Sequence, residues 1–258
     1  IVDDLIVYRF NIEKYLLVVN ASNIEKDWLW ISTNNDMEAF LSNVSNDYCL
    51  FAVQGPKAVD VLQSITEVDL AAIKFYHFHE GSLAGIDGII ISATGYTGAG
   101  GFELYVKNEH AESLWNQIFQ AGTEYDIKPI GLGARDTLRL EMGYCLYGND
   151  IDDKTSPLEG GLGWITKFSK SFINSAALAL QKEKGVQKKL IAFEIDGKGI
   201  PRHDYPIMNL EGAIMGKVTS GTMSPSLNKG IGMGYVPIGD HQIGTKIFIE
   251  IRHKKVPA

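Results

Sequence analysis

The spacing of short apolar runs changes once along the chain, near residue 182, and this change divides the sequence into two regions. Before it, strand-like runs alternate with helix-like segments. After it, short apolar runs follow one another between turns of glycine, proline, asparagine and aspartate, a pattern typical of a small β-barrel or sandwich. The expected strands of this second region are 190–195, 213–219, 231–236 and 246–251. The polar stretch 181–185 indicates a linker, so we predict a region 1–180, with two subdomains, and a C-terminal β-barrel domain at 186–258.

The first region mixes the apolar periods of strands and helices. Its expected strands are 5–10, 15–19, 48–53 and several within 75–106, and its expected helices are 22–30, one starting at Gly55-Pro56, and 110–121. Ser22 and Glu25 are spaced as a capping box, in which each side chain satisfies a free amide at the start of the helix. The order of these elements predicts an α+β fold of ferredoxin-like units, followed by the small β-barrel.

The charge and composition of the chain argue against several classes of function. A net charge of −7 and a pI of about 5.4 argue against sequence-independent nucleic-acid binding, which needs a dense basic surface. No apolar run approaches membrane-spanning length, and no signal-peptide pattern is present. Cys49 and Cys145 could pair, but isolated cysteines in a chain of this length more often stay reduced, which favours a cytoplasmic protein.

The stretch 135–150 contains the most informative group of charged residues. It predicts a helix in which Arg135 and Arg139, four residues apart, lie on one face. The helix is expected to end at Gly143, and a loop rich in aromatic residues and glycine follows. Paired guanidinium groups beside such a loop could anchor a carboxylate or a phosphate. The alternative is a surface helix whose arginines pair with Asp136 and Glu141.

Six segments of the chain resemble, in the same order, the T-protein of the glycine cleavage system, the tetrahydrofolate-dependent aminomethyltransferase. They are VDDLIV at 2–7, QGP at 54–56, GYTG at 95–98, GLGARDTLRLEMGYCLYGND at 131–150, TSPLE at 155–159, and TSG with SPSL at 219–221 and 224–227. The resemblance implies folate-binding α+β units before the β-barrel, and an enzyme of glycine catabolism and one-carbon metabolism. It implies transfer of the one-carbon unit from aminomethyl-lipoyl H-protein to tetrahydrofolate, with release of ammonia. Compared with the family, we expect an N-terminal segment and a short C-terminal tail to be missing from this chain.

The resemblance also implies a catalytic residue near the start of the chain. Asp4 matches the second aspartate of the family's DDL segment, which lies beside the folate nitrogens, and is expected to orient tetrahydrofolate and help proton transfer. From chemistry alone, Asp3 and Asp4 would be a solvated pair or would cap a turn. Asn20 matches a folate-contacting asparagine of the family, and the alternative is a turn residue that ends a strand.

Two further folate-binding residues are expected around the glycine-rich loop, residues 95–101. No Lys-Ser/Thr pair or helix follows this loop, so it is not a phosphate loop, and its Tyr96 matches the family's tyrosine at the folate site. Glu103 follows on a strand, where its side chain points away from those of Phe102 and Leu104. It matches the family's folate-binding glutamate, and a carboxylate suits the two-donor N–H edge of a pterin.

Arg135 matches the family's ligand-binding arginine. It could hold a folate carboxylate or fix Glu103 through an ion pair, whereas Arg139 is expected to be structural. His77 and His79 share one strand face, but no third ligand accompanies them, so no metal site is expected.

Two other functions are compatible with the same fold. One is a folate-binding accessory protein in iron–sulfur cluster maintenance, whose members have KGCYxGQE where this chain has EMGYCLYGND at 141–150. The other is the folate domain of a sarcosine or dimethylglycine dehydrogenase, which needs a flavin domain, and no dinucleotide fingerprint is present here. Both differences favour the aminomethyltransferase.

Overall fold

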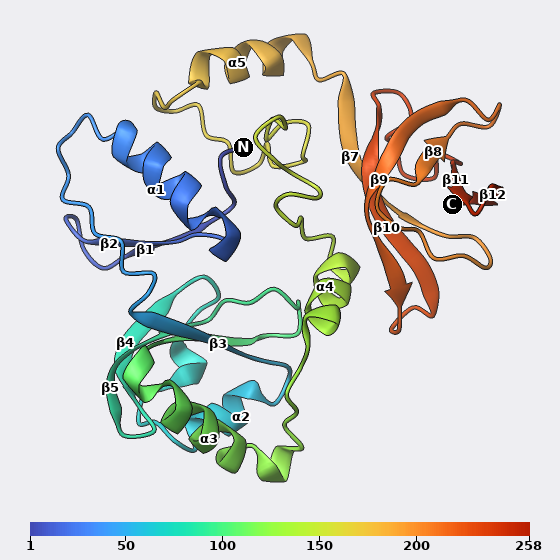
Figure 1. The fold of residues 1–258 in the computed structure, drawn as a ribbon. Helices are drawn as coiled ribbons and strands as arrows, with labels where there is room; N and C mark the ends of the chain where they lie inside the picture. The colour runs from blue at the N-terminus through green and yellow to red at the C-terminus, as the bar shows by residue number, and fades with distance from the viewer. The chain divides into compact units, whose positions relative to one another are not determined.

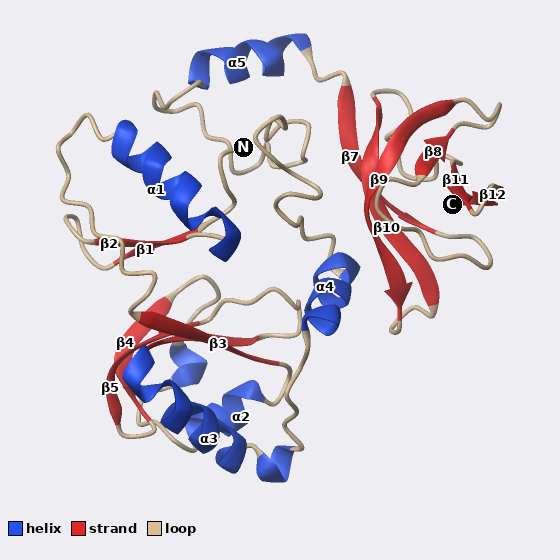
Figure 2. Cartoon of the chain, in the orientation of Figure 1, coloured by secondary structure: helices blue, strands red, loops and turns tan.

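The computed structural model describes residues 1–258, which form two compact units. We call Ile6–Leu138 the hairpin unit, and Ile1–Leu5 with Arg139–Ala258 the barrel unit. Figure 1 traces the chain from its N-terminus to its C-terminus, and Figure 2 distinguishes helices from strands.

The hairpin unit is built on a four-stranded antiparallel sheet with the strand order β3-β6-β5-β4. The strands are β3 (Tyr48–Gln54), β4 (Phe78–Leu83), β5 (Ile86–Ser92) and β6 (Gly101–Lys107). Helices α2 (Ala58–Gln63) and α3 (Ala111–Ala121) cover one face of this sheet (Figure 1). Alternate strand residues pack against the helices, because neighbouring residues of a strand point to opposite faces. The buried core on this side includes Leu62, Leu83, Ile89, Ile91, Phe102, Leu104, Leu114 and Ile118.

The opposite face of the sheet packs against the hairpin of β1 (Ile6–Arg9) and β2 (Tyr15–Val18). Tyr8 of β1 is buried there with Ile90 and Tyr105, and the rings of Tyr8 and Tyr105 meet edge to face with their centroids 5.6 Å apart. A two-stranded hairpin is at most marginally stable alone, so this packing holds it in place. Glu103 points to the same face, because it lies two residues from Tyr105 on β6.

The hairpin leads into a short 3-10 helix, Ala21–Asn23, and then into α1 (Ile24–Thr33). The capping box predicted from Ser22 and Glu25 is wrong. Asn23 is the residue before the helix, and its side chain makes no capping hydrogen bond. The Asn23 N–H donates to the Asn20 carbonyl at 2.8 Å, and the turn that this bond closes moves the start of the helix beyond Ser22.

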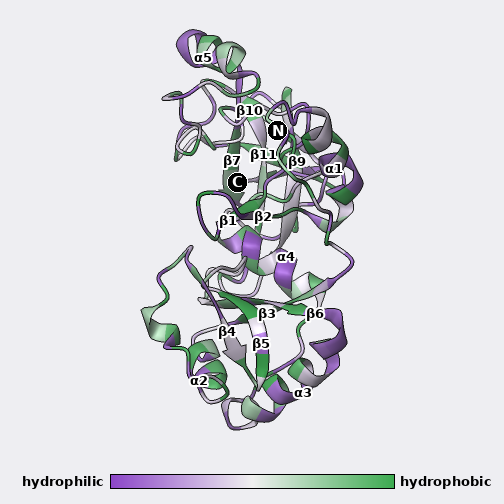
Figure 3. Cartoon of the chain, turned by 90° about the vertical axis from the view of Figure 1, so that its left-hand side faces the viewer, coloured by the Kyte–Doolittle hydropathy of each residue, from purple (hydrophilic) through white to green (hydrophobic).

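Helix α4 (Leu132–Glu141) is the helix predicted from the arginine pair, whereas α5 (Ser175–Lys184) has no counterpart among the expected elements. Residues 181–184 form the last turn of α5, and Gly185, with φ of +81°, ends it, so most of the expected linker is helical. In Figure 3 the ribbon of α4 has hydrophilic segments in purple, whereas β3 is green and hydrophobic. The helices all fall short of the length and apolar character that crossing a bilayer demands.

The barrel unit contains one antiparallel sheet with the strand order β12-β11-β8-β9-β10-β7. The strands are β7 (Lys188–Glu194), β8 (Pro206–Met208), β9 (Ile214–Ser224), β10 (Lys229–Pro237), β11 (Phe248–Ile251) and β12 (Lys254–Pro257). Just after β7, the N–H of Asp196 donates to the carbonyl of Pro257 at 2.8 Å, which joins the two outermost strands at one end. Strands β7, β9, β10 and β11 are those predicted, and β8 and β12 are additional. Their core includes Phe193, Ile195, Ile207, Val218, Val236, Ile247 and Ile249.

Candidate functional site

Glu103 lies on β6, just after the glycine-rich loop, and Thr94 holds one of its carboxylate oxygens. The Thr94 hydroxyl donates a short hydrogen bond to Oε2 of Glu103. Thr94 is buried whereas Glu103 is half-buried, so the carboxylate stands between the protein interior and solvent. This bond leaves the second oxygen, Oε1, as an acceptor for a ligand.

Four buried residues, Tyr8, Ser92, Thr94 and Tyr105, place their hydroxyl groups together next to Glu103, and we call them the hydroxyl cluster. The Tyr8 hydroxyl donates to Ser92 Oγ at 2.9 Å and lies 3.2 Å from the hydroxyl of Tyr105. The Ser92 and Thr94 oxygens are 3.0 Å apart. Burial, then the charge of Glu103 and the hydrogen bond with Tyr8, raise the pKa of Tyr105, so its phenol stays protonated.

The side-chain amide of Gln54, at the end of β3, holds the glycine-rich loop. Its Nε2 donates to the carbonyl oxygens of Thr94 and Phe102 at 3.1 and 3.2 Å. Its Oε1 accepts a hydrogen bond from the Thr97 hydroxyl at 3.0 Å. A Cβ on Gly95 would lie 1.9 Å from this Oε1, so the amide occupies the space that a side chain there would need. Gln54 therefore fixes both ends of the loop.

Replacing Gly95 with alanine is expected to displace the Gln54 amide and to weaken tetrahydrofolate binding by about tenfold, because the two carbonyl oxygens lose their donor. Isothermal titration calorimetry with tetrahydrofolate measures this. Gly133→Ala in α4 is the matched control, because a Cβ there has open space and alanine suits a helix. Wild-type affinity in Gly95→Ala would show that folate binding does not need the hydrogen bonds between Gln54 and the loop.

Tyr96 of the loop lies against Arg135 of α4. The guanidinium carbon of Arg135 is 4.4 Å from the centroid of the Tyr96 ring, a cation–π contact. Arg135 is exposed and forms no ion pair with Glu103. Of its two expected roles, the one that fixes Glu103 is therefore not seen. A guanidinium stacked on a ring still has its in-plane N–H groups for an anionic ligand.

Asn20 lies before the 3-10 helix in an extended conformation, with φ −63° and ψ 134°. Its backbone carbonyl closes the turn, and its side chain makes no capping hydrogen bond. The turn therefore depends on the backbone of Asn20, and the folate contact expected for its side chain stays a prediction.

Asp4 belongs to the barrel unit, together with Cys145 and Asp150. Its side chain is exposed. Burial, then the negative charges of Asp150 and Asp4, raise the pKa of the Cys145 thiol to about 12. The thiol thus stays protonated at neutral pH, which argues against a nucleophilic role. The charge of Asp4 acts on the loop that contains Cys145, and its catalytic role stays a prediction.

Arg139 forms a buried ion pair within the barrel unit. Its Nη1 donates to Oδ2 of Asp150 at 2.7 Å, and the two side chains are 1% and 0% exposed. Its Nη2 donates to Ser220 Oγ at 2.9 Å, and the Leu146 N–H donates to the same Asp150 oxygen at 2.8 Å. These bonds join α4, the loop after it and β9, so the structural role expected for Arg139 is confirmed.

Glu141, the last residue of α4, binds the turn after β9. Its carboxylate accepts hydrogen bonds from the Ser224 hydroxyl at 2.5 Å and the Ser226 hydroxyl at 2.9 Å. Burial raises the pKa of Glu141, but these hydrogen bonds outweigh it and lower the pKa below its ordinary value. In the alternative of a surface helix whose arginines pair with Asp136 and Glu141, the pairing with Glu141 is therefore wrong, because serines bind that carboxylate.

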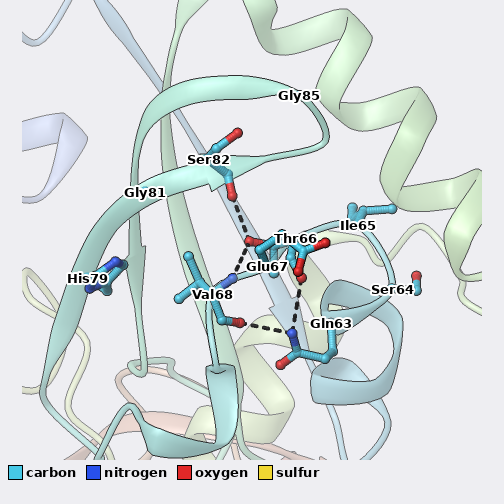
Figure 4. A pocket seen from close by; sticks show the side chains of 10 residues that line it. All are labelled: Gln63, Ser64, Ile65, Thr66, Glu67, Val68, His79, Gly81, Ser82 and Gly85. Carbon is cyan, nitrogen blue, oxygen red and sulfur yellow. Dashed lines mark hydrogen bonds between the residues drawn. The ribbon is translucent and has the colours of Figure 1, made fainter.

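A cavity of about 620 Å³ in the hairpin unit lies between residues 63–68, at and after the end of α2, and β4 with the turn that follows it (Figure 4). Its polar groups bond to one another: the Thr66 hydroxyl donates to the Ser82 carbonyl at 2.6 Å, and Gln63 Nε2 donates to the Val68 carbonyl at 2.9 Å. None of the expected site residues lines it. The cavity is therefore not the candidate site.

Both regions of the sequence match models of one protein family. The model described as the GCVT N-terminal domain matches residues 1–170. The model described as the glycine cleavage T-protein C-terminal barrel domain matches residues 188–258. The chain belongs to the glycine cleavage T-protein family.

Members of the T-protein family are similar to the whole chain. It is 59% identical to an aminomethyltransferase of Flavobacterium psychrophilum and 58% identical to one of Bacteroides thetaiotaomicron, and each match covers 100% of this chain and 72% of the relative. The crystal structure of glycine cleavage system aminomethyltransferase T from Bartonella henselae matches with a TM-score of 0.88 at 30% identity, over 100% of this chain and 70% of that one. These matches confirm the α+β fold with its C-terminal barrel, the aminomethyltransferase activity and the use of tetrahydrofolate.

Two polar residues, one within a T-protein segment and one directly before another, have an importance that appears only in the structure. Gln54 is the first residue of the QGP segment, and Thr94 directly precedes the GYTG segment. A signal for Thr94 exists in the alternation of polar Ser92 and Thr94 with apolar Ile91 and Ala93, which places the two hydroxyls on the opposite face from the helix-side core.

Proposed function

We propose that this protein takes the aminomethyl group from the lipoyl arm of H-protein and delivers its carbon to tetrahydrofolate. The carbon exchanges its bonds to the arm sulfur and the amino nitrogen for two bonds to folate nitrogens, so ammonia and the dihydrolipoyl arm leave. Tetrahydrofolate, when bound, supplies the nitrogen that accepts the one-carbon unit. A cytoplasmic location is part of this proposal, supported by Cys49 and Cys145, which form no disulfide.

The carboxylate of Glu103 is the observation that best supports a pterin ligand. Its Oε2 is held by Thr94, and its Oε1 can accept from an N–H donor. A pterin presents neighbouring ring and exocyclic N–H groups on one edge, and hydrogen bonds to a carboxylate are stronger than those to a neutral acceptor. Glu103 would therefore fix the orientation of the pterin as well as its affinity.

Tyr96 and Arg135 supply the other kinds of contact that a folate needs. The pair offers the apolar face of a ring and the N–H groups of a guanidinium, which suit a flat heterocycle and a carboxylate. Asn20 would add an amide contact. Holding two reactants in place in this way can supply roughly 7–11 kcal/mol of the barrier in well-oriented cases.

Asp4 is proposed as the catalytic carboxylate. Its exposed side chain can reach a ligand, and a carboxylate can orient the accepting nitrogen and take or return its proton. Cys145 has no part in this proposal, because its thiol stays protonated.

Replacing Glu103 with alanine is expected to weaken tetrahydrofolate binding by about 10- to 100-fold, because the pterin donors lose a charged acceptor. Calorimetric titration of the variant measures this. Glu80→Ala, which removes an exposed glutamate from the same sheet, is the control and should bind like the wild type. Equal affinities for Glu103→Ala and Glu80→Ala would show that the pterin lies elsewhere.

The first experiment mixes the protein with aminomethyl-loaded H-protein and tetrahydrofolate, and follows ammonia and methylenetetrahydrofolate together. Release of the two products in equal amounts supports the proposed transfer. Folate binding without release of either product would contradict it and favour a folate-binding accessory role.

A further inference from the structure

The hydroxyl cluster has a definite direction of hydrogen bonding, which follows from counting protons. Each hydroxyl has one proton to donate, so Thr94 can donate either to Glu103 or to Ser92, but not to both. The charged carboxylate is the stronger acceptor, so the Thr94 proton goes to Glu103. Ser92 must then donate to Thr94 across their 3.0 Å separation.

The same count extends to the two tyrosines. The Tyr8 hydroxyl lies 2.9 Å from Ser92 Oγ and 3.4 Å from Thr94 Oγ1, and it donates to Ser92 across the shorter distance. Tyr8, whose proton is then used, accepts from Tyr105 at 3.2 Å. The cluster is thus a chain of donors that runs from Tyr105 through Tyr8, Ser92 and Thr94 to the carboxylate. Tyr105 can begin this chain because its phenol stays protonated.

We propose that this chain of hydroxyls holds Glu103 in the orientation that binds the pterin, with Thr94 as the residue that acts on it directly. The inference rests on the proposed function of Glu103. These four residues are positioning residues, because only Glu103 is expected to touch the ligand. Donors aligned in one direction polarise one another, so the last bond of the chain is stronger than an isolated one.

Burial supports a role beyond packing. Ser92 is 0% exposed and Thr94 3% exposed, and a buried hydroxyl is costly unless its hydrogen bonds are made. Apolar side chains would fill the same space at lower cost, yet the polar groups lie in one line that ends at the half-buried carboxylate. Tyr8 belongs to the hairpin, so the chain also links β1 to the orientation of Glu103.

The test compares Thr94→Val with Thr94→Ser. Valine keeps the shape of threonine and lacks the hydroxyl, whereas serine keeps the hydroxyl. The dissociation constant of tetrahydrofolate should rise about tenfold in Thr94→Val and stay within about twofold of wild type in Thr94→Ser. Equal affinities in the two variants would overturn the proposal. Unfolding midpoints are measured alongside, to show that the variants fold. If Thr94→Val does not fold, Tyr8→Phe takes its place, and the dissociation constant of tetrahydrofolate should then rise about threefold. Wild-type affinity in Tyr8→Phe would equally overturn the proposal.

Glu103→Gln separates this inference from the function on which it rests. In the Glu103→Gln background, Thr94→Val should add less than about twofold to the loss of affinity, because the hydroxyl no longer has a charged partner. A full additional tenfold loss would show that Thr94 acts independently of Glu103, against the proposal. Normal binding by Glu103→Gln alone would instead reject the pterin role of Glu103. Weak binding by Glu103→Gln with normal binding by Thr94→Val would reject only the hydroxyl chain.

Discussion

Replacing Asp4 with asparagine is expected to slow the release of ammonia and methylenetetrahydrofolate by roughly 100-fold or more, while the dissociation constant of tetrahydrofolate stays within about threefold of wild type. Asparagine keeps the size of the side chain and can still hydrogen-bond the folate, but it cannot take or return a proton. Single-turnover assays with loaded H-protein measure the rate, and calorimetric titration measures the affinity.

Asp3→Asn is the matched control for this experiment, because it removes the neighbouring carboxylate and leaves Asp4 in place. It is expected to turn over at a rate close to wild type. Unchanged turnover in Asp4→Asn would remove Asp4 from the mechanism. Equal losses in the two variants would show that the charge of this segment matters and that the individual carboxylate does not.

Replacing Arg139 with methionine is expected to lower the free energy of unfolding of the barrel unit by roughly 3–5 kcal/mol, because Asp150 would keep its charge in a buried site without its partner. The Asp150 carboxylate also accepts hydrogen bonds from the Leu146 N–H and the Ser220 hydroxyl. If the carboxylate moved, these bonds would weaken and the loop after α4 would loosen. Chemical denaturation followed by tryptophan fluorescence measures the change.

Arg135→Met provides the comparison, since it makes the same substitution four residues earlier on the same helix at an exposed position. Its free energy of unfolding should differ from wild type by less than about 0.5 kcal/mol. Adding Asp150→Asn to Arg139→Met should recover part of the lost stability, because the unpaired charge is removed. A small loss in Arg139→Met alone would show that Asp150 is stabilised by its other donors.

The elements that could be predicted from the sequence are those marked by a regular alternation of apolar and polar residues within the element itself. The alternation of Phe102, Glu103 and Leu104 predicted both a strand and the direction in which Glu103 points, and the structure places the two apolar residues in the helix-side core. The spacing of Arg135 and Arg139 predicted α4. Resemblance to the T-protein family then supplied the expected roles, which composition and spacing alone do not contain.

What could not be predicted depends on contacts between distant parts of the chain. The Tyr8 hydroxyl contacts those of Ser92 and Tyr105, which lie 84 and 97 residues away in the sequence. A periodic pattern of apolar residues cannot predict such distant contacts. Ser22 and Glu25 have the spacing of a capping box, but a 3-10 turn takes the place of the helix start. Helix α5 consists of alanines, leucines and polar residues, and its apolar residues do not recur at a clear helical spacing. The lysines and glutamate at its end therefore indicated a linker.

The glycine-rich loop is held by the neutral side-chain amide of Gln54. Gln54 has no charge to gain or lose, so its bonds to Thr94, Phe102 and Thr97 do not depend on pH. Added salt, which screens exposed charges, leaves bonds between neutral groups largely intact. The bonds that Gln54 makes should therefore persist across acid, neutral and saline conditions, and sensitivity of turnover to those conditions is expected to arise from the ionisable groups beside the loop, Glu103 and Arg135 among them.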